Sequence, residues 1–175
     1  YDSTVPVQGT SQAPIVEGDL LIAAVGGEPD AKVVAFDKVT GDEVWRSLDN
    51  ISETGYSAPI VIDAGGVRQL IFWHATAITS LNPETGEIYW NQDFTIGGGM
   101  AITTPVRSGR YLVVSQFFNG SMMLALNPDR PDARVLWQGR NRGELPEQTD
   151  TLHSIISTPI VVDGHLLSLI HISEP

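Results

Sequence analysis

Two landmarks recur in this sequence about every 45 residues, and this repetition constrains the fold more than any other feature. The first landmark is an Asp or Asn followed by a Trp. The Asp or Asn stands at Asp37, Asn82 and Asn127, and the Trp at Trp45, Trp90 and Trp137. The second landmark is a Pro before a short apolar run, at Pro14, Pro59, Pro105 and Pro159. Two landmarks that share one period indicate a tandem array of one structural unit.

Each unit has the pattern of four short strands. In the second unit the expected strands cover residues 59–62, 69–73, 77–81 and 88–90, with a turn over residues 82–86. No segment shows a sustained 3.6-residue apolar period with helix caps. The sequence therefore predicts an all-β fold, a partial β-propeller of about three and a half four-stranded antiparallel blades. The blades are expected near residues 11–50, 57–94, 103–139 and, incomplete, 157–166, within one domain over 1–166.

The landmark residues have an expected structural role at the boundary between blades. The Trp of the fourth strand can lie flat across this boundary, and Gly41 or Gly86 leaves room for an indole because glycine has no Cβ. Burying one Trp contributes on the order of 4–6 kcal/mol, as an upper bound. Asp37, Asn82 and Asn127 are expected to accept hydrogen bonds from their own turns.

The pattern Ala-x-Asp-x-x-Thr-Gly-x-x-x-Trp resembles the tryptophan-docking motif of the pyrroloquinoline-quinone (PQQ)-like, or quinoprotein-type, β-propellers. Residues 35–45 match it fully, residues 80–90 match with Ser and Asn replacing Ala and Asp, and residues 125–137 match only at the ends. The resemblance implies a ring of seven or eight blades, of which this chain supplies about half. A half ring is expected to expose two unpaired flanks.

That family contains two functional classes. Quinone-dependent dehydrogenases of alcohols or sugars hold PQQ with calcium, whereas the quinone-free members include the scaffold lipoprotein of the outer-membrane assembly machine. The segments 7–12 and 151–159 are most similar to the quinone-free group. This resemblance implies a bacterial, periplasmic or otherwise extracytoplasmic scaffold with an unidentified protein partner and no cofactor. The alternatives are a fragment of a PQQ-dependent dehydrogenase and a polysaccharide- or ligand-binding propeller.

The composition of the chain excludes several kinds of partner and site. The net charge of −11 argues against nucleic acid or an anionic membrane as the partner, because both require Lys and Arg patches. The chain has no Cys, which excludes disulfides, thiolate metal sites and Cys nucleophiles, as well as the adjacent Cys pair of many alcohol-oxidising family members. No apolar run approaches the ~20 residues of a membrane-spanning helix. Three of the four Trp occupy repeat positions, which leaves only Trp73 as the floor of a quinone site.

The sequence predicts no catalytic residue and no metal ligand, but it offers a few candidate binding residues. His74 is either a channel-facing polar group or metal ligand or, more simply, a strand-end His with its hydrogen bonds satisfied. His153 lies in the longest connection, residues 139–157, which is either a binding loop or a solvated insertion. Polar residues before the repeated Pro, including Gln12, Thr104 and Thr158, are expected to form a ring around the central axis. These residues contact a ligand or partner, or they only shape the turns.

The last nine residues break the repeat. Residues 167–175 resemble a translated sequencing adapter joined to a truncated reading frame, and we expect them to be non-native. His171 and Glu174 should then carry no function.

Overall fold

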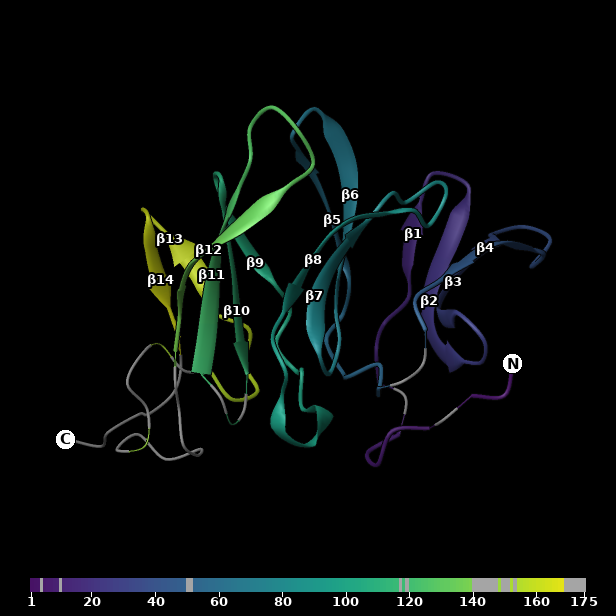
Figure 1. Ribbon diagram of the computed structural model, residues 1–175, viewed down its shortest axis with the longest axis horizontal. Helices are drawn as coiled ribbons and strands as arrows, with labels where there is room; N and C mark the ends of the chain where they lie inside the picture. The colour runs from purple at the N-terminus through teal and green to yellow at the C-terminus, as the bar shows by residue number, and fades with distance from the viewer. Residues whose placement is uncertain are drawn as a thin grey trace.

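The structure is a computed structural model that describes residues 1–3, 5–9, 11–49, 52–116, 118, 120–139, 148, 152 and 154–168. This part of the chain forms three four-stranded antiparallel sheets and one two-stranded hairpin, arranged side by side (Figure 1). It also contains one 3₁₀ turn, η1 (Gly97–Gly99). Within the same residues there is no helix of the length and apolar character that a membrane crossing demands.

In every sheet the strands follow one another in chain order. The first sheet contains β1 (Ile15–Glu17), β2 (Leu20–Gly27), β3 (Ala31–Asp37) and β4 (Glu43–Ser47). The second contains β5 (Ile60–Ala64), β6 (Val67–Trp73), β7 (Ala77–Leu81) and β8 (Ile88–Asp93). The third contains β9 (Val106–Ser108), β10 (Tyr111–Gln116), β11 (Gly120–Leu126) and β12 (Ala133–Gln138), and the hairpin contains β13 (Ile160–Val162) and β14 (His165–Leu167).

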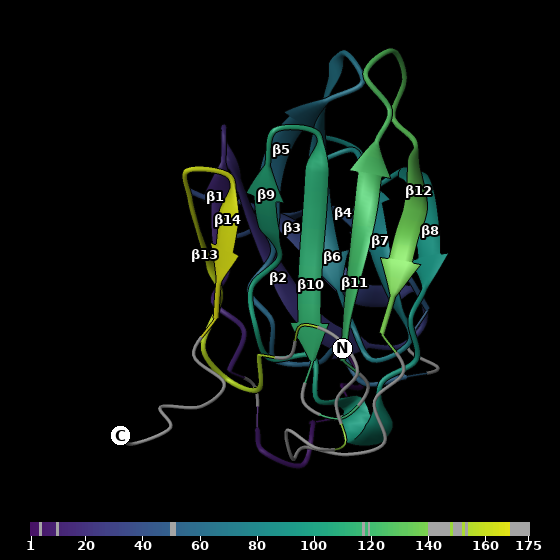
Figure 2. The same ribbon diagram turned by 90° about the vertical axis from the view of Figure 1, so that its left-hand side faces the viewer.

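This arrangement confirms the prediction of an all-β partial propeller with three complete blades and part of a fourth. The turns that join first to second strands and third to fourth strands lie at one end of the molecule, which we call the turn end. It is uppermost in Figures 1 and 2. The connections between sheets and η1 lie at the opposite end.

Both faces of the second sheet are buried because its side chains alternate between two neighbours. Leu70 and Phe72 pack with Val33 and Ala35 of the first sheet. Ile71 and Trp73, one position along, belong to the core shared with residues of the third sheet such as Leu124. The continuous apolar run over residues 70–73 of β6 is therefore explained by burial on both faces of the sheet.

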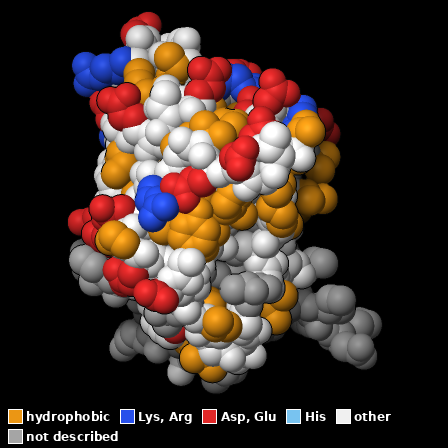
Figure 3. Space-filling model, turned by 90° about the vertical axis from the view of Figure 1, so that its right-hand side faces the viewer, with side chains coloured by type: hydrophobic (Ala, Val, Ile, Leu, Met, Phe, Trp, Pro, Cys, Tyr) orange, Lys and Arg blue, Asp and Glu red, His pale blue; other side chains and the backbone are white. Residues whose placement is uncertain are grey.

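The outermost flanks keep apolar side chains exposed. Val16 and Val44 on the first sheet are 58% and 52% exposed, on the face opposite the side chain of Trp45. Figure 3 shows the apolar patch on this side of the molecule. At the other end of the array, Ile160 and Leu167 of the hairpin are 59% and 52% exposed. These flanks are the surfaces where a propeller sheet would meet a further neighbour.

Candidate functional site

Trp45 joins the first sheet to the second. Its indole lies against Gly86, where a Cβ would stand only 2.5 Å from Cε3 of the ring. The indole Nε1 donates a hydrogen bond of 3.1 Å to the backbone oxygen of Pro83, in the same turn of the second sheet. The glycine that makes room for Trp45 is therefore that of the following repeat. Gly41, its counterpart in the first repeat, has no atom within 4 Å of the corresponding Cβ position.

Trp90 is anchored differently because the third repeat lacks the Thr-Gly turn. Its Nε1 donates a 2.9 Å hydrogen bond to Oε1 of Gln69 within its own sheet. Gln69 is fully buried, accepts a second hydrogen bond from Ser80 Oγ, and donates through Nε2 to the oxygen of Ala64. Trp137, next to the incomplete fourth blade, is only half-buried.

The Asp and Asn landmarks stabilise their own turns. Oδ1 of Asp37 accepts hydrogen bonds from the backbone N–H groups of Val39 and Thr40, both at 2.8 Å. Asn82 and Asn127 each accept one such bond, at 2.8 and 2.9 Å. The bonds from Thr40 and Val39 hold the pKa of Asp37 below its ordinary value, because they stabilise the carboxylate.

The polar residues before the repeated prolines link neighbouring sheets. Gln12 Nε2 donates to the backbone oxygen of Thr54 at 2.9 Å, and Ser57 Oγ donates to that of Thr103 at 2.9 Å. Thr158 Oγ1 accepts from the backbone N–H of Thr104 at 3.0 Å. The side chains of Gln12, Ser57 and Thr158 therefore make hydrogen bonds between the segments that lead into neighbouring sheets.

His74 is buried at the end of β6, with 6% of its surface exposed. Its two ring nitrogens lie 3.2 Å from Thr79 Oγ1 and 3.3 Å from Thr76 Oγ1. Burial, assisted by the charge of Lys32, lowers the pKa of His74 to about 3, so the imidazole is neutral at physiological pH. His153, the other candidate histidine, lies outside the described residues.

A groove lies at the turn end, between the second and third sheets. It has a volume of about 570 Å³. One wall is the β5–β6 hairpin and the other the β9–β10 turn with the β11–β12 turn; the lining residues are Asp63–Arg68, Arg107, Gly109, Arg110 and Leu126–Pro128. The walls approach closely at Gly65, where a Cβ would stand 2.1 Å from the oxygen of Arg130.

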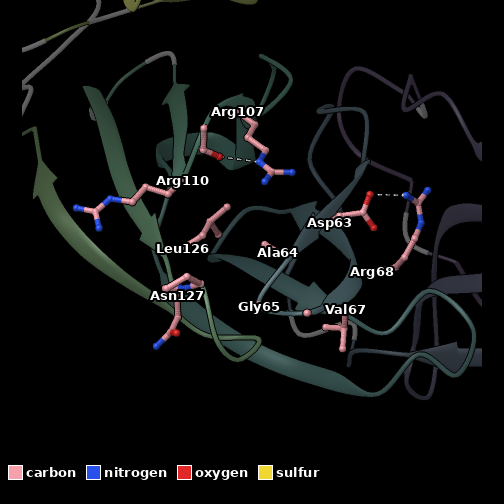
Figure 4. Close-up of a pocket in the computed structure, with 12 residues that line it drawn as sticks. Asp63, Ala64, Gly65, Val67, Arg68, Arg107, Arg110, Leu126 and Asn127 are labelled. Atoms are coloured by element: carbon pink, nitrogen blue, oxygen red, sulfur yellow. Dashed lines mark hydrogen bonds and ion pairs between the residues drawn. The ribbon is translucent and has the colours of Figure 1, made fainter.

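Three arginines line this groove, and they differ in how their charge is balanced (Figure 4). Arg68 pairs with Glu17 at 2.6 Å and with Asp63 at 3.0 Å, and these contacts raise its pKa. Within the described ranges, no carboxylate lies within 4.0 Å of the guanidinium of Arg107 or Arg110.

The two arginines without carboxylate partners are nevertheless held in place. Arg107 Nε donates to the oxygen of Gly109 at 2.9 Å. The guanidinium carbon of Arg110 lies 5.3 Å from the ring centre of Tyr111, and Figure 4 shows this side chain extending away from the second sheet. The sequence did not reveal this groove, although Arg107 and Arg110 stand on either side of Gly109, and both side chains are exposed.

The alternative function requires a calcium-and-quinone centre. Among the described residues, no three His, Cys, Asp or Glu side chains lie together as a possible metal site. Trp73, which could have been the floor of a quinone site, is completely buried and stacks on Phe94 at a ring-centre distance of 6.4 Å. This part of the chain therefore does not fit that centre.

Stacked four-stranded sheets with an Asp or Asn turn and a Trp in each repeat define a partial β-propeller of PQQ-like repeats. A family model described as outer membrane protein assembly factor BamB matches residues 29–170. The match covers most of the chain, which therefore belongs to this family.

The solved structures include a similar fold in the crystal structure of BamB from Moraxella catarrhalis. The identity is 18% and the TM-score 0.48, and the alignment covers 93% of this chain and 44% of that chain. This chain thus spans less than half the length of that relative. The comparison with curated proteins found no match.

Proposed function

We propose that this chain is part of a non-catalytic, extracytoplasmic propeller that binds a protein partner during outer-membrane assembly. Its family membership over residues 29–170 is the observation that carries the proposal. The resemblance of segments 7–12 and 151–159 to the quinone-free members of the family supports the non-catalytic part.

The groove at the turn end is the contact surface that we assign to this function. It offers apolar area from Val67, Leu126 and Pro128, and its lining also includes the exposed residues Arg107 and Arg110. In a chain with a net charge of −11, guanidiniums without carboxylate partners favour contact with an acidic segment of the partner. Arg is also enriched in protein interfaces, because its planar guanidinium can donate two parallel hydrogen bonds to one carboxylate.

Site-specific photocrosslinking in intact cells tests this proposal. A photoreactive amino acid at Val67, in the groove, should yield a crosslink to one discrete cell-envelope protein. The double variant Arg107→Glu with Arg110→Glu should abolish this crosslink, since it reverses the charge of the groove. A photoreactive amino acid at Val7, which is 87% exposed in the N-terminal segment, serves as the control for random collision.

Two results would refute the proposal. One is a crosslinking pattern from Val67 that equals the pattern from Val7 and survives charge reversal. The other is dye reduction when the protein is given PQQ, calcium and an alcohol, which would show the dehydrogenase activity of the alternative function.

A further inference from the structure

Lys32 is a buried cation in a chain where the other Lys, Lys38, is paired at the surface. Only 2% of Lys32 is exposed, and its Nζ donates a 2.9 Å hydrogen bond to Ser52 Oγ. No carboxylate of the described residues lies within 4.0 Å of this ammonium group. Burial of an ammonium without a close counter-ion is costly unless its N–H groups find acceptors.

The hydrogen bonds around His74 determine which of its nitrogens carries the proton. Thr79 has a single hydroxyl proton, which it donates to Asn91 Oδ1 at 2.7 Å. Its oxygen must therefore accept from His74 Nε2, and the neutral ring leaves Nδ1 as an acceptor. Thr76 Oγ1 then donates to Nδ1, and Ser52 Oγ donates to Thr76 Oγ1 at 3.3 Å.

All the hydrogen bonds of this network consequently point in one direction. The chain begins at the Lys32 ammonium, and its last bond runs from Asn91 Nδ2 to Asp93 Oδ1 at 3.0 Å. The hydroxyl groups of Ser52, Thr76 and Thr79 each donate their single proton to the next member of the network. Among the described residues, Lys32 Nζ has three N–H groups and donates to one acceptor, so it is the strongest donor in this network for a further molecule.

The network lines a cavity between the first and second sheets, on the side of the sheet connections. The cavity has a volume of about 400 Å³, within the range of small-molecule sites. Leu48, Ala77 and Ile88 add apolar surface to its wall. The lining also includes the carboxylates of Asp49 and Asp93.

These charges define the kind of ligand that fits. One ammonium attracts an anion, but two carboxylates in the same lining repel it, and this repulsion is about twice as large for a doubly charged phosphate or dicarboxylate as for a monocarboxylate. A carboxylate with one negative charge and a neutral or cationic remainder satisfies both conditions. We propose that this cavity binds a small monocarboxylate, whose carboxylate accepts hydrogen bonds from Lys32 Nζ and whose remainder packs on the apolar wall.

Three probes with the same six-carbon chain test the proposal: hexanoate, 6-aminohexanoate and hexylamine. The protein is labelled with ¹³C at the lysine Cε atoms, so that its two lysines give two NMR signals. Hexanoate and 6-aminohexanoate should shift the Lys32 signal saturably and raise the pKa of Lys32, because a carboxylate stabilises the ammonium. Hexylamine, or sodium chloride at the same concentration, should neither shift the Lys32 signal saturably nor raise the pKa of Lys32. Lys38 is the internal control.

Variants separate binding from folding. Lys32→Met keeps the length of the side chain and should abolish saturable binding measured by calorimetry, whereas Lys38→Met should leave it unchanged. If Lys32→Met does not fold, the NMR titration of the unaltered protein decides alone. The proposal is overturned if hexanoate fails to shift Lys32 saturably, if hexylamine shifts it equally, or if folded Lys32→Met still binds.

Discussion

The contact between Trp45 and Gly86 makes a prediction that a single methyl group can test. In Gly86→Ala the new Cβ would stand 2.5 Å from Cε3 and 2.9 Å from Cδ2 of the indole. The ring cannot move away easily, because only 7% of Trp45 is exposed. Its Nε1 also donates a hydrogen bond to the backbone oxygen of Pro83. We expect this overpacking to cost ~1–3 kcal/mol of unfolding free energy.

Gly41→Ala is the matched control. Gly41 has φ +78° and Gly86 has φ +74°, so an Ala at either position has the same left-handed strain of ~1–2 kcal/mol. The loss of backbone entropy in the unfolded chain is also the same. No atom lies within 4 Å of the Cβ position at Gly41, so the difference between the two variants isolates the clash with Trp45.

Urea unfolding followed by circular dichroism measures this difference. With an m-value of roughly 2 kcal/mol/M, the midpoint of Gly86→Ala should lie ~0.5–1.5 M below that of Gly41→Ala. In a Trp45→Ala background the two glycine variants should become equal, because the ring that causes the clash is gone. Equal midpoints in the presence of Trp45 would refute the reasoning.

Three further perturbations have defined outcomes. Gln69→Leu should lower the unfolding free energy by about 2–5 kcal/mol, since it leaves the buried Trp90 Nε1–H and a second donor unpaired; a loss below ~1 kcal/mol in urea would contradict this. The pKa of Asp37 is lower in the folded than in the unfolded chain. Its contribution to the unfolding free energy is therefore complete above the unfolded pKa and is lost as the pH falls through the folded pKa. In Asp37→Asn the unfolding free energy should therefore depend less on pH below about pH 4 than in the unaltered protein. His74 has a folded pKa of about 3 against 6.5 unfolded, so stability should fall as pH drops through this window, and less so in His74→Gln; an NMR titration of His74 near pH 6.5 would exclude the buried neutral ring.

The periodic landmarks were sufficient to predict the architecture. The strands expected at residues 69–73 and 77–81 appear as β6 (Val67–Trp73) and β7 (Ala77–Leu81). This succeeded because turns with Pro, Gly and Asx residues impose local geometry that depends little on the rest of the fold. The same applies to Asp37, whose bonds are made within its own turn.

Contacts between distant segments were not predictable in the same way. Gln69 replaces the missing glycine turn as the partner of Trp90, but a Gln in an apolar strand does not reveal its partner. Lys32 interrupts the apolar run of β3, which signals an unusual residue without showing that Ser52 lies beside it. The groove depends on how closely two turns approach at Gly65, and this distance is set by packing between sheets.

The account depends on the second sheet receiving the indole of Trp45, from the preceding repeat, at Gly86 of its turn. The chemical shift of the Gly86 Hα protons measures this directly, with Gly41 in the equivalent turn as the reference. We predict an upfield ring-current shift of Gly86 and nuclear Overhauser effects to the Trp45 ring protons, with neither at Gly41. Identical shifts for the two glycines, without contact between Gly86 and Trp45, would contradict it.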